Sequence, residues 1–180
     1  LQPEQRVTWS RYDADSRLVR ETVGRGEVVV AADGSVNVTM LSEHGGIRTD
    51  STYDSRGNLV QQSEGFADAF DDPQTLQTTR FTYDSLDRLQ RVTDPEGFST
   101  STVYDAYGNV RSITRGAYLL KPEDPGYDAA KANVAEPRTE SLRYDLEGRL
   151  SRREDAEGSI STYAYNGFDE LTRSSSGEHL

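Results

Sequence analysis

Short stretches in which polar and apolar residues alternate recur along the chain, and turn-forming residues bound each one. Two examples are FSTSTVY at residues 98–104 and SISTYAY at residues 159–165. Alternation with a period of two, in segments rich in Thr, Tyr and Val, is typical of half-buried β-strands. The tetrapeptides before them, DPEG at 94–97 and DAEG at 155–158, have Asp first and Gly fourth, as type I turns prefer. The pattern predicts short strands joined by tight turns.

A second turn motif is Tyr-Asp with an aliphatic residue six positions after the Tyr, and it occurs six times. The tyrosines are Tyr12, Tyr53, Tyr83, Tyr104, Tyr144 and Tyr165, and the aliphatic residues are Leu18, Leu59, Leu89, Val110, Leu150 and Leu171. Asn166 replaces Asp in the last copy. The intervals of 41, 30, 21, 40 and 21 residues fit a unit of about 21 residues, with two units lacking the signature and one lengthened by an insertion.

Each signature is predicted to be the turn of a β-hairpin, so that consecutive units form an antiparallel meander. The Asp residues are Asp13, Asp54, Asp84, Asp105 and Asp145, and the fourth-position glycines Gly57, Gly108 and Gly148 are expected to adopt positive φ. The linker turns are assigned to Asp94, Pro95, Gly97, Asp155 and Gly158. We expect the Tyr rings to stack from unit to unit alongside the aliphatic series.

Three segments depart from this pattern. Residues 28–40 predict a hairpin with Asp33-Gly34 as a two-residue turn, standing where a Tyr-Asp block is due. Residues of about 66–76 and 117–138 are interpreted as inserted loops, the second with three prolines and one or two helical turns in its Ala-rich part. The chain is thus expected to be one repeat region over residues 1–180, and because it begins with Leu1, to be a fragment of a longer chain.

Composition and charge narrow the function classes. Only 33% of the residues are hydrophobic and 28% are charged, which disfavours a thick core. A net charge of −11 repels phosphate backbones, so we expect no nucleic-acid partner. The chain has no Cys, which excludes disulfides and thiolate metal sites. It also has no apolar run of the ~20 residues that a membrane span needs.

The candidates for catalysis are weak, and we predict neither an enzyme nor a cofactor. An active site needs one constellation, whereas the Asp residues recur at every unit as turn formers do. His44 and His179 lie far apart without a partnered nucleophile, and Asp13-Ala14-Asp15 begins like a calcium loop but continues with Arg17 and Leu18. Arg17, Arg88 and Arg149 each follow an Asp by four residues, and such exposed pairs contribute about 0–1 kcal/mol.

The blocks YDSRGNL, YDAYGNV and YDLEGRL, with the linkers TDPEGFSTSTVYD and EDAEGSISTYAYN, resemble the YD repeats of the RHS family. That family includes bacterial polymorphic toxins, the B and C components of Tc toxins, wall-associated proteins and teneurins. The resemblance implies a strand ribbon that spirals into a hollow shell, which in toxin members encloses a C-terminal effector. It also implies export by bacteria, to a secreted or cell-surface location. DPEG at 94–97 is similar to one half of the family's self-cleaving aspartate motif, but the second half is missing.

Three hypotheses of different classes follow. The chain is part of the wall of an RHS shell, with neighbouring repeats and an enclosed toxin domain as partners; or an exposed adhesion surface that binds glycans through its Tyr-rich strands; or a repeat-bearing enzyme. The first is preferred. The expected fold class is all-β, a curved antiparallel meander of about eight YD-repeat hairpins that forms an open fragment of a spiral shell.

Overall fold

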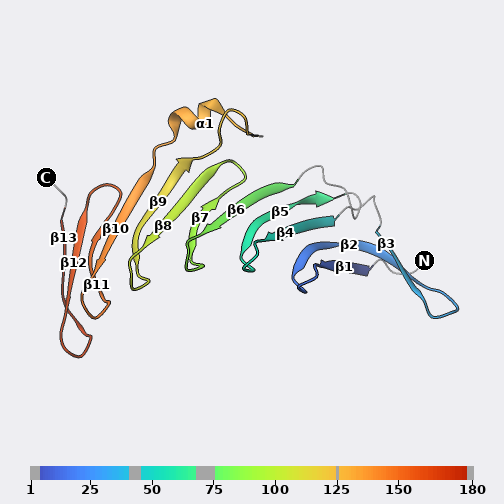
Figure 1. The fold of residues 1–180 in the computed structure, drawn as a ribbon, viewed down its shortest axis with the longest axis horizontal. Coiled ribbons are helices and arrows are strands. Elements are labelled where there is room, and N and C mark those ends of the chain that lie inside the picture. The colour runs from blue at the N-terminus through green and yellow to red at the C-terminus, as the bar shows by residue number, and fades with distance from the viewer. Residues whose placement is uncertain (1–4, 41–45, 68–75, 125, 178–180) are drawn as a thin grey trace. The chain divides into compact units, whose positions relative to one another are not determined.

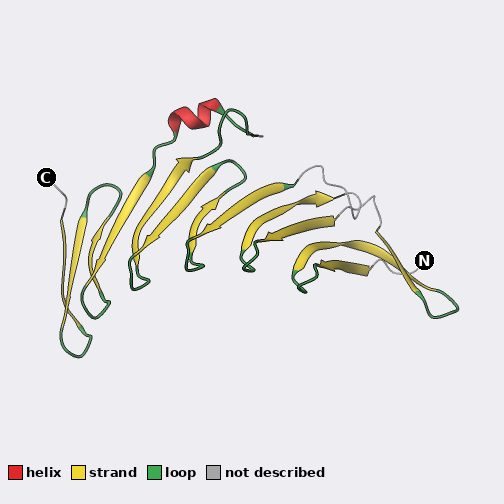
Figure 2. Ribbon diagram, viewed as in Figure 1, coloured by secondary structure: helices red, strands yellow, loops and turns green. Residues whose placement is uncertain are grey.

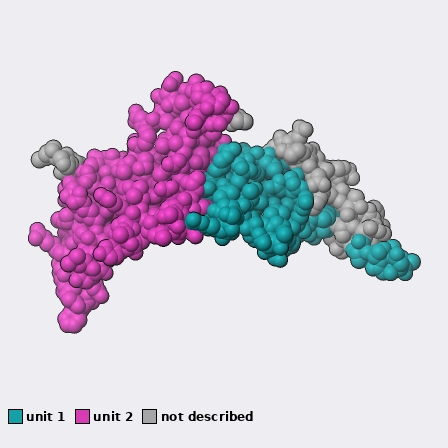
Figure 3. Space-filling view, viewed as in Figure 1, with its two compact units in different colours: residues 1–81 teal, residues 82–180 magenta. Residues whose placement is uncertain are grey.

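A computed structural model describes residues 5–40, 46–67, 76–124 and 126–177 of the chain. It is all-β apart from one short helix (Figure 2). The chain divides into two compact units, Leu1–Phe81 and Thr82–Leu180 (Figure 3). The all-β class and the antiparallel meander of hairpins expected from the sequence are confirmed.

The first unit is a meander of antiparallel strands in the order β1-β2-β4-β5-β6, and β3 pairs with β2 off this path (Figure 1). The strands are β1 (Gln5–Tyr12), β2 (Leu18–Val30), β3 (Val36–Met40), β4 (Gly46–Tyr53), β5 (Leu59–Ala67) and β6 (Gln77–Tyr83), which ends just inside the second unit. The signature tyrosines Tyr12 and Tyr53 are the last residues of β1 and β4. Leu18 and Leu59 begin the strands that follow, so the Tyr-Asp motif is the connection between paired strands.

The second unit continues the pattern as β7 to β13 in sequence order, each strand antiparallel to the next. The strands are β7 (Leu89–Thr93), β8 (Phe98–Tyr104), β9 (Val110–Tyr118), β10 (Arg138–Tyr144), β11 (Leu150–Glu154), β12 (Ile160–Tyr165) and β13 (Leu171–Gly177), and the helix α1 (Ala129–Val134) lies between β9 and β10. Within this unit the Tyr-Asp turns lie at one end of the strands and the linkers at the other (Figure 1).

Few side chains are fully buried, as expected of a single-layered sheet with this composition. The buried polar residues are Thr22, Arg48, Ser63 and Ser99, and Thr22 is the largest side chain that is completely covered. Large apolar side chains such as Val103 and Leu146 remain exposed, at 49% and 102%. Stability therefore rests on the strand ladders and on the contacts between neighbouring turns more than on a deep core.

The intervals predicted two units without the signature, but neither is a separate hairpin in the strand path, which contains six Tyr-Asp hairpins among the described strands. Residues 28–40 do form a hairpin, but β2 pairs with β4 through Arg20–Gly24 and with β3 only through Gly26–Val30. The hairpin is therefore formed by the last residues of β2 together with β3, and it is not a separate unit in the strand path. The interval of 40 residues between Tyr104 and Tyr144 contains the segment with the helix Ala129–Val134.

The turn of that hairpin also differs from the expected two-residue type. The Ala31 N–H donates to the Ser35 carbonyl at 2.8 Å, which leaves three residues in the loop. Gly34, the third of them, has a φ of 82°. A type I turn followed by a left-handed residue is the usual geometry of three-residue hairpin loops, and its extra residue suits the twist of the flanking strands.

The segment interpreted as an insertion at 117–138 carries α1. Asp128 caps the helix by accepting from the backbone N–H groups of Ala130 and Lys131, and Lys131 Nζ forms an ion pair with Glu96 at 2.7 Å. Glu96 belongs to the linker turn between β7 and β8, so the insertion folds back over that turn. Most of the other proposed insertion, at about 66–76, lies outside the described residues.

Candidate functional site

The Tyr-Asp turns have one geometry, shown by the turn between β8 and β9. The Asp105 N–H donates to the Asn109 carbonyl at 2.9 Å, and the Gly108 N–H donates to the Asp105 carbonyl at 3.2 Å. One carboxylate oxygen of Asp105 accepts from the backbone N–H groups of Tyr107 and Asn109, both at 2.9 Å. Gly108 has a φ of 94°, in the left-handed region that favours glycine. The Asp side chain thus satisfies two backbone donors that the turn leaves unpaired.

The same two bonds to the side chain occur in the other described turns. They are made by Asp13, Asp54, Asp84, Asp145 and, with its amide oxygen, Asn166. The linker aspartates Asp94 and Asp155 make them as well. Positive φ angles occur at Gly57, Gly97, Gly148 and Gly158, and at Ser16, Asp87 and Asp169 in the three signatures without the turn Gly. The turn therefore forms with or without glycine.

The signature tyrosines connect one hairpin to the preceding one. The Tyr104 hydroxyl donates to the Leu89 carbonyl at 2.9 Å, and the Tyr144 hydroxyl donates to the Val110 carbonyl at 3.0 Å. Tyr53 and Tyr165 make the same bond to the carbonyls of Leu18 and Leu150, at 3.1 and 3.0 Å. Each acceptor is the aliphatic residue of the preceding signature. The residue six positions after one signature Tyr therefore offers its backbone carbonyl to the hydroxyl of the next signature Tyr.

Three arginines add a second connection, which we call the arginine latch and define by Arg17, Arg88 and Arg149. Each donates through Nε to the Asp of its own turn, at 2.8, 2.7 and 2.8 Å respectively. A terminal guanidinium nitrogen of each donates to a backbone carbonyl of the next signature, that of the residue directly after its Tyr, at 3.2, 3.3 and 3.1 Å. The guanidinium carbons lie 5.1, 4.5 and 4.9 Å from the ring centres of Tyr53, Tyr104 and Tyr165.

These contacts correct two expectations. The arginines are not merely partners of an exposed pair, because each joins a carboxylate, a carbonyl and an aromatic face on two successive hairpins. At the three latched interfaces the ring is covered by a guanidinium, so stacking of Tyr on Tyr is not what holds them. The sequence carries a signal of the latch that was missed: the fifth position after Tyr is alternately Arg17, Asn58, Arg88, Asn109 and Arg149.

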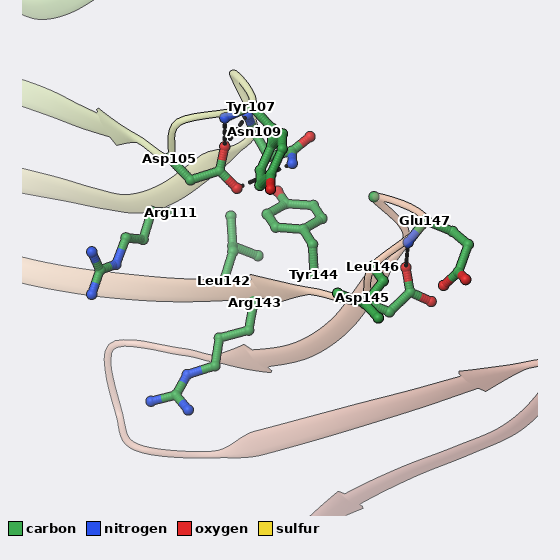
Figure 4. Close-up of a pocket in the computed structure, with 11 residues that line it drawn as sticks. Asp105, Tyr107, Asn109, Arg111, Leu142, Arg143, Tyr144, Asp145, Leu146 and Glu147 are labelled. Atoms are coloured by element: carbon green, nitrogen blue, oxygen red, sulfur yellow. Dashed lines mark hydrogen bonds between the residues drawn. The ribbon is translucent and has the colours of Figure 1, made fainter.

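Where the latch position is Asn109, the structure has an open cleft of about 700 Å³ between the β8–β9 and β10–β11 turns (Figure 4). The Asn109 amide donates to Asp105 Oδ2 at 3.1 Å and so stays within its own turn. The Tyr144 ring faces the cleft, and the exposed tips Tyr107 and Leu146 flank it. The other lining side chains are Arg111, Leu142, Arg143, Asp145 and Glu147.

No cluster of three or more His, Cys, Asp or Glu side chains that could hold a metal ion occurs in the part of the chain that the structure describes. His44 and His179 lie outside the described residues. The described helix is too short and too polar to cross a membrane. The signature carboxylates are already engaged by backbone N–H groups, which suits a structural role.

Sequence comparison identifies the repeats. The profile of the RHS Repeat family matches residues 71–100, 83–118 and 144–179. The chain contains RHS repeats. Among curated protein sequences, none matches the RHS chain.

Solved structures share the fold of this RHS chain. The crystal structure of TcdB2-TccC3-Cdc42 aligns with a TM-score of 0.56 at 16% identity, covering 96% of this chain and 10% of that chain. The structure of the Photorhabdus luminescens Tc holotoxin pore with a TccC3 mutation aligns with a TM-score of 0.57 at 15% identity, over 96% and 10% of the two chains. At such identities the likeness shows the fold alone. The RHS chain spans about a tenth of the length of these solved chains.

The aspartates of the Tyr-Asp signatures have lowered pKa values, for related reasons. The backbone N–H of Arg17 is the main cause of the lowered pKa of Asp13, and the Arg88 guanidinium is the main cause at Asp84. Desolvation by neighbouring atoms raises the pKa at Asp54, Asp105 and Asp145, but the hydrogen bonds from their turns outweigh it and the net shift is downward.

The lowered pKa values predict acid sensitivity. A carboxyl group with a pKa lower in the folded than in the unfolded chain stabilises the fold above the unfolded value, and this stabilisation is lost as the pH falls through the folded value. Since the ordinary value is 3.8, stability should fall below about pH 4. Asp145→Asn, which keeps an amide oxygen as Asn166 does, should make the free energy of unfolding less dependent on pH. Urea unfolding between pH 7 and 3 measures this.

Glu123→Gln is the charge-matched control, because Glu123 is exposed on the inserted segment. It should leave the pH dependence of the wild type unchanged. If Asp145→Asn and Glu123→Gln gave the same pH profile, the hydrogen bonds to Asp145 would not be the source of acid sensitivity.

Proposed function

We propose that this RHS segment is a non-catalytic part of the wall of a shell that encloses a C-terminal toxin or effector, in a protein exported by bacteria. The observation that carries the proposal is the equivalence of the turns. Successive hairpins repeat the same carboxylate bonds, the same Tyr hydroxyl bond and, at alternate positions, the same latch. Repetition of this kind extends a surface, whereas catalysis needs a single arrangement at one place.

The fold supports the same proposal. The chain aligns over 96% of its length with structures containing TcdB2 and TccC3, although it covers only 10% of those chains. β1 and β13 are the outer strands of the described path, and each has a backbone edge with which strands of further repeats would pair. The proposed partners are therefore neighbouring repeats along the wall and the enclosed polypeptide.

A carbohydrate-binding adhesion surface is the alternative. It requires aromatic faces open to sugar rings, but at three interfaces the signature Tyr face is covered by a guanidinium. Tyr107 and Phe168 are exposed, at 92% and 87%, but they stand on different turns. A shell wall agrees better with rings that hold the hairpins together.

Protection of a cargo tests the proposal. In the complete protein that contains this segment, the C-terminal domain should resist a protease that rapidly digests the same domain expressed alone, and electron microscopy should show a hollow particle. Equal digestion rates, together with a particle that has no internal space, would contradict a shell. Binding of the segment to a glycan array, with no protection of a C-terminal domain, would favour the adhesion surface.

A further inference from the structure

The cleft at Asn109 lies where the arginine latch is missing. Asn109 occupies the sequence position of Arg17, Arg88 and Arg149, but its shorter side chain ends at Asp105. Among the described residues, cations lie over the Tyr53, Tyr104 and Tyr165 rings, and none lies over Tyr144. Tyr144 nevertheless keeps its hydroxyl bond to Val110, so the ring is held in the orientation of the latched ones.

The polar groups that a latch guanidinium contacts are also present. At each latched interface, the carbonyl of the residue that follows the Tyr accepts two hydrogen bonds, one from a backbone N–H of its own turn and one from the latch arginine. At the cleft, the corresponding carbonyl is that of Asp145, which accepts the Gly148 N–H at 3.1 Å. A carbonyl oxygen has two lone pairs, so a second donor can be accommodated there. Asp105 Oδ2, which matches the acceptor of each latch Nε, receives only the Asn109 amide among the described contacts.

We propose that the cleft binds an arginine side chain from a basic segment of a partner polypeptide. The guanidinium lies over the Tyr144 ring, between the Asp105 carboxylate and the Asp145 carbonyl, as the chain's own arginines do at three other interfaces. Tyr107 and Leu146 cover the aliphatic stem. Arginine is favoured over lysine because a planar fork contacts both oxygens while its face stacks on the ring.

The charges around the cleft agree with a cationic occupant. The carboxylates of Asp105, Asp145 and Glu147 lie around the Tyr144 ring in Figure 4. The guanidinium groups of Arg111 and Arg143 point away from that ring. Desolvation and the Asp105 charge raise the pKa of Tyr144, which is consistent with a negative environment. The net charge of −11 attracts basic segments over a longer range.

Titration with short peptides tests the proposal by NMR of the full 180-residue chain. Acetyl-Gly-Arg-Gly-amide should shift the backbone amides of residues 145–148 in a saturable way. The matched peptide with citrulline, which has the same shape without the charge, should bind at least about tenfold more weakly. Equal binding of the two peptides would overturn the proposal. Preferential binding of acetyl-Gly-Glu-Gly-amide would also overturn it, by making the cleft an anion site at Arg111 and Arg143.

Substitutions in the chain test whether the peptide occupies the latch position. Asn109→Arg should supply the missing latch, abolish binding of the arginine peptide and raise the melting temperature, while Glu123→Arg, which adds the same side chain outside the cleft, should leave binding unchanged. Undiminished binding to Asn109→Arg would contradict the proposal. Tyr144→Leu removes the ring face and should abolish binding of the arginine peptide. The site does not rest on the shell proposal: cargo protection and peptide binding are measured separately, and either can fail alone.

Discussion

Replacing Gly97 with Val is expected to lower the free energy of unfolding by about 3–5 kcal/mol, because backbone strain and overpacking add at this position. Gly97 ends the linker turn before β8 with a φ of 92°. A Cβ atom there would lie 2.6 Å from Leu120 Cγ and 2.9 Å from Tyr118 Cε2. Both neighbours belong to the inserted segment, whose Leu119 N–H donates to the Gly97 carbonyl at 2.9 Å. Urea unfolding followed by circular dichroism measures the loss.

Gly148→Val is the matched control for this prediction. Gly148 has a φ of 81°, but nothing lies within 4 Å of the position that a Cβ would take. Only the backbone strain should remain, which costs about 1–2 kcal/mol. Equal losses for the two variants would mean that the insertion does not press on the linker turn as the structure shows.

Asp50→Ala is expected to lower the free energy of unfolding by about 3 kcal/mol, because it removes the carboxylate that a buried arginine contacts. Arg48 is only 3% exposed and lies on the central strand β4. Its Nη2 contacts Asp50 Oδ2 at 2.5 Å, and Arg20 from β2 donates to Asp50 Oδ1 at 2.8 Å. Although burial raises the pKa of Asp50, the bonds from Arg48 and Arg20 lower it overall, so the carboxylate is charged at neutral pH.

Glu154→Ala provides the control, since Arg152 and Glu154 on β11 have the same spacing of two residues but are 37% and 40% exposed. Removing this pair should cost less than about 1 kcal/mol. Adding Arg48→Met to Asp50→Ala should recover much of the lost stability, because the buried charge is then gone. A double variant that is less stable than Asp50→Ala would contradict this account. Urea denaturation curves of the wild type, Asp50→Ala, Glu154→Ala and the double variant give the four free energies of unfolding to compare.

The turns and strands could be predicted because their signals are local. Tyr104, Asp105 and Gly108 mark a strand end, a side chain that binds the turn backbone and a position with positive φ, all within five residues. The family resemblance, carried by the same blocks, pointed to the fold that the structure has. The alternation of strand residues and the charged composition indicated a sheet without a deep core.

The features that sequence reasoning missed depend on which strands become neighbours. The contact of Arg17 with the Tyr53 ring, for example, joins residues that are 36 positions apart in the sequence. It can be predicted only once the two hairpins are known to be adjacent. The hairpin at 28–40 was counted as a unit because it stands where a Tyr-Asp block is due, while the pairing of β2 with β4 removes it from the strand path. The burial of Arg48 likewise requires the strands on both sides of β4.

The order of the strands has a consequence for how the chain reaches this structure. Among the described strands of each unit nearly all pairing joins strands that follow one another in the sequence, and only the pairing of β2 with β4 passes over an intervening strand. Each hairpin closes a short loop, so the entropic barrier to folding is small and can be crossed at any position along the chain. Such a chain is able to assemble one hairpin at a time as it leaves the ribosome, because nearly every strand pairs with the strand that is made directly after it. A force applied at the C-terminal end would separate the strands in the reverse order, since each hairpin is held mainly by its neighbours.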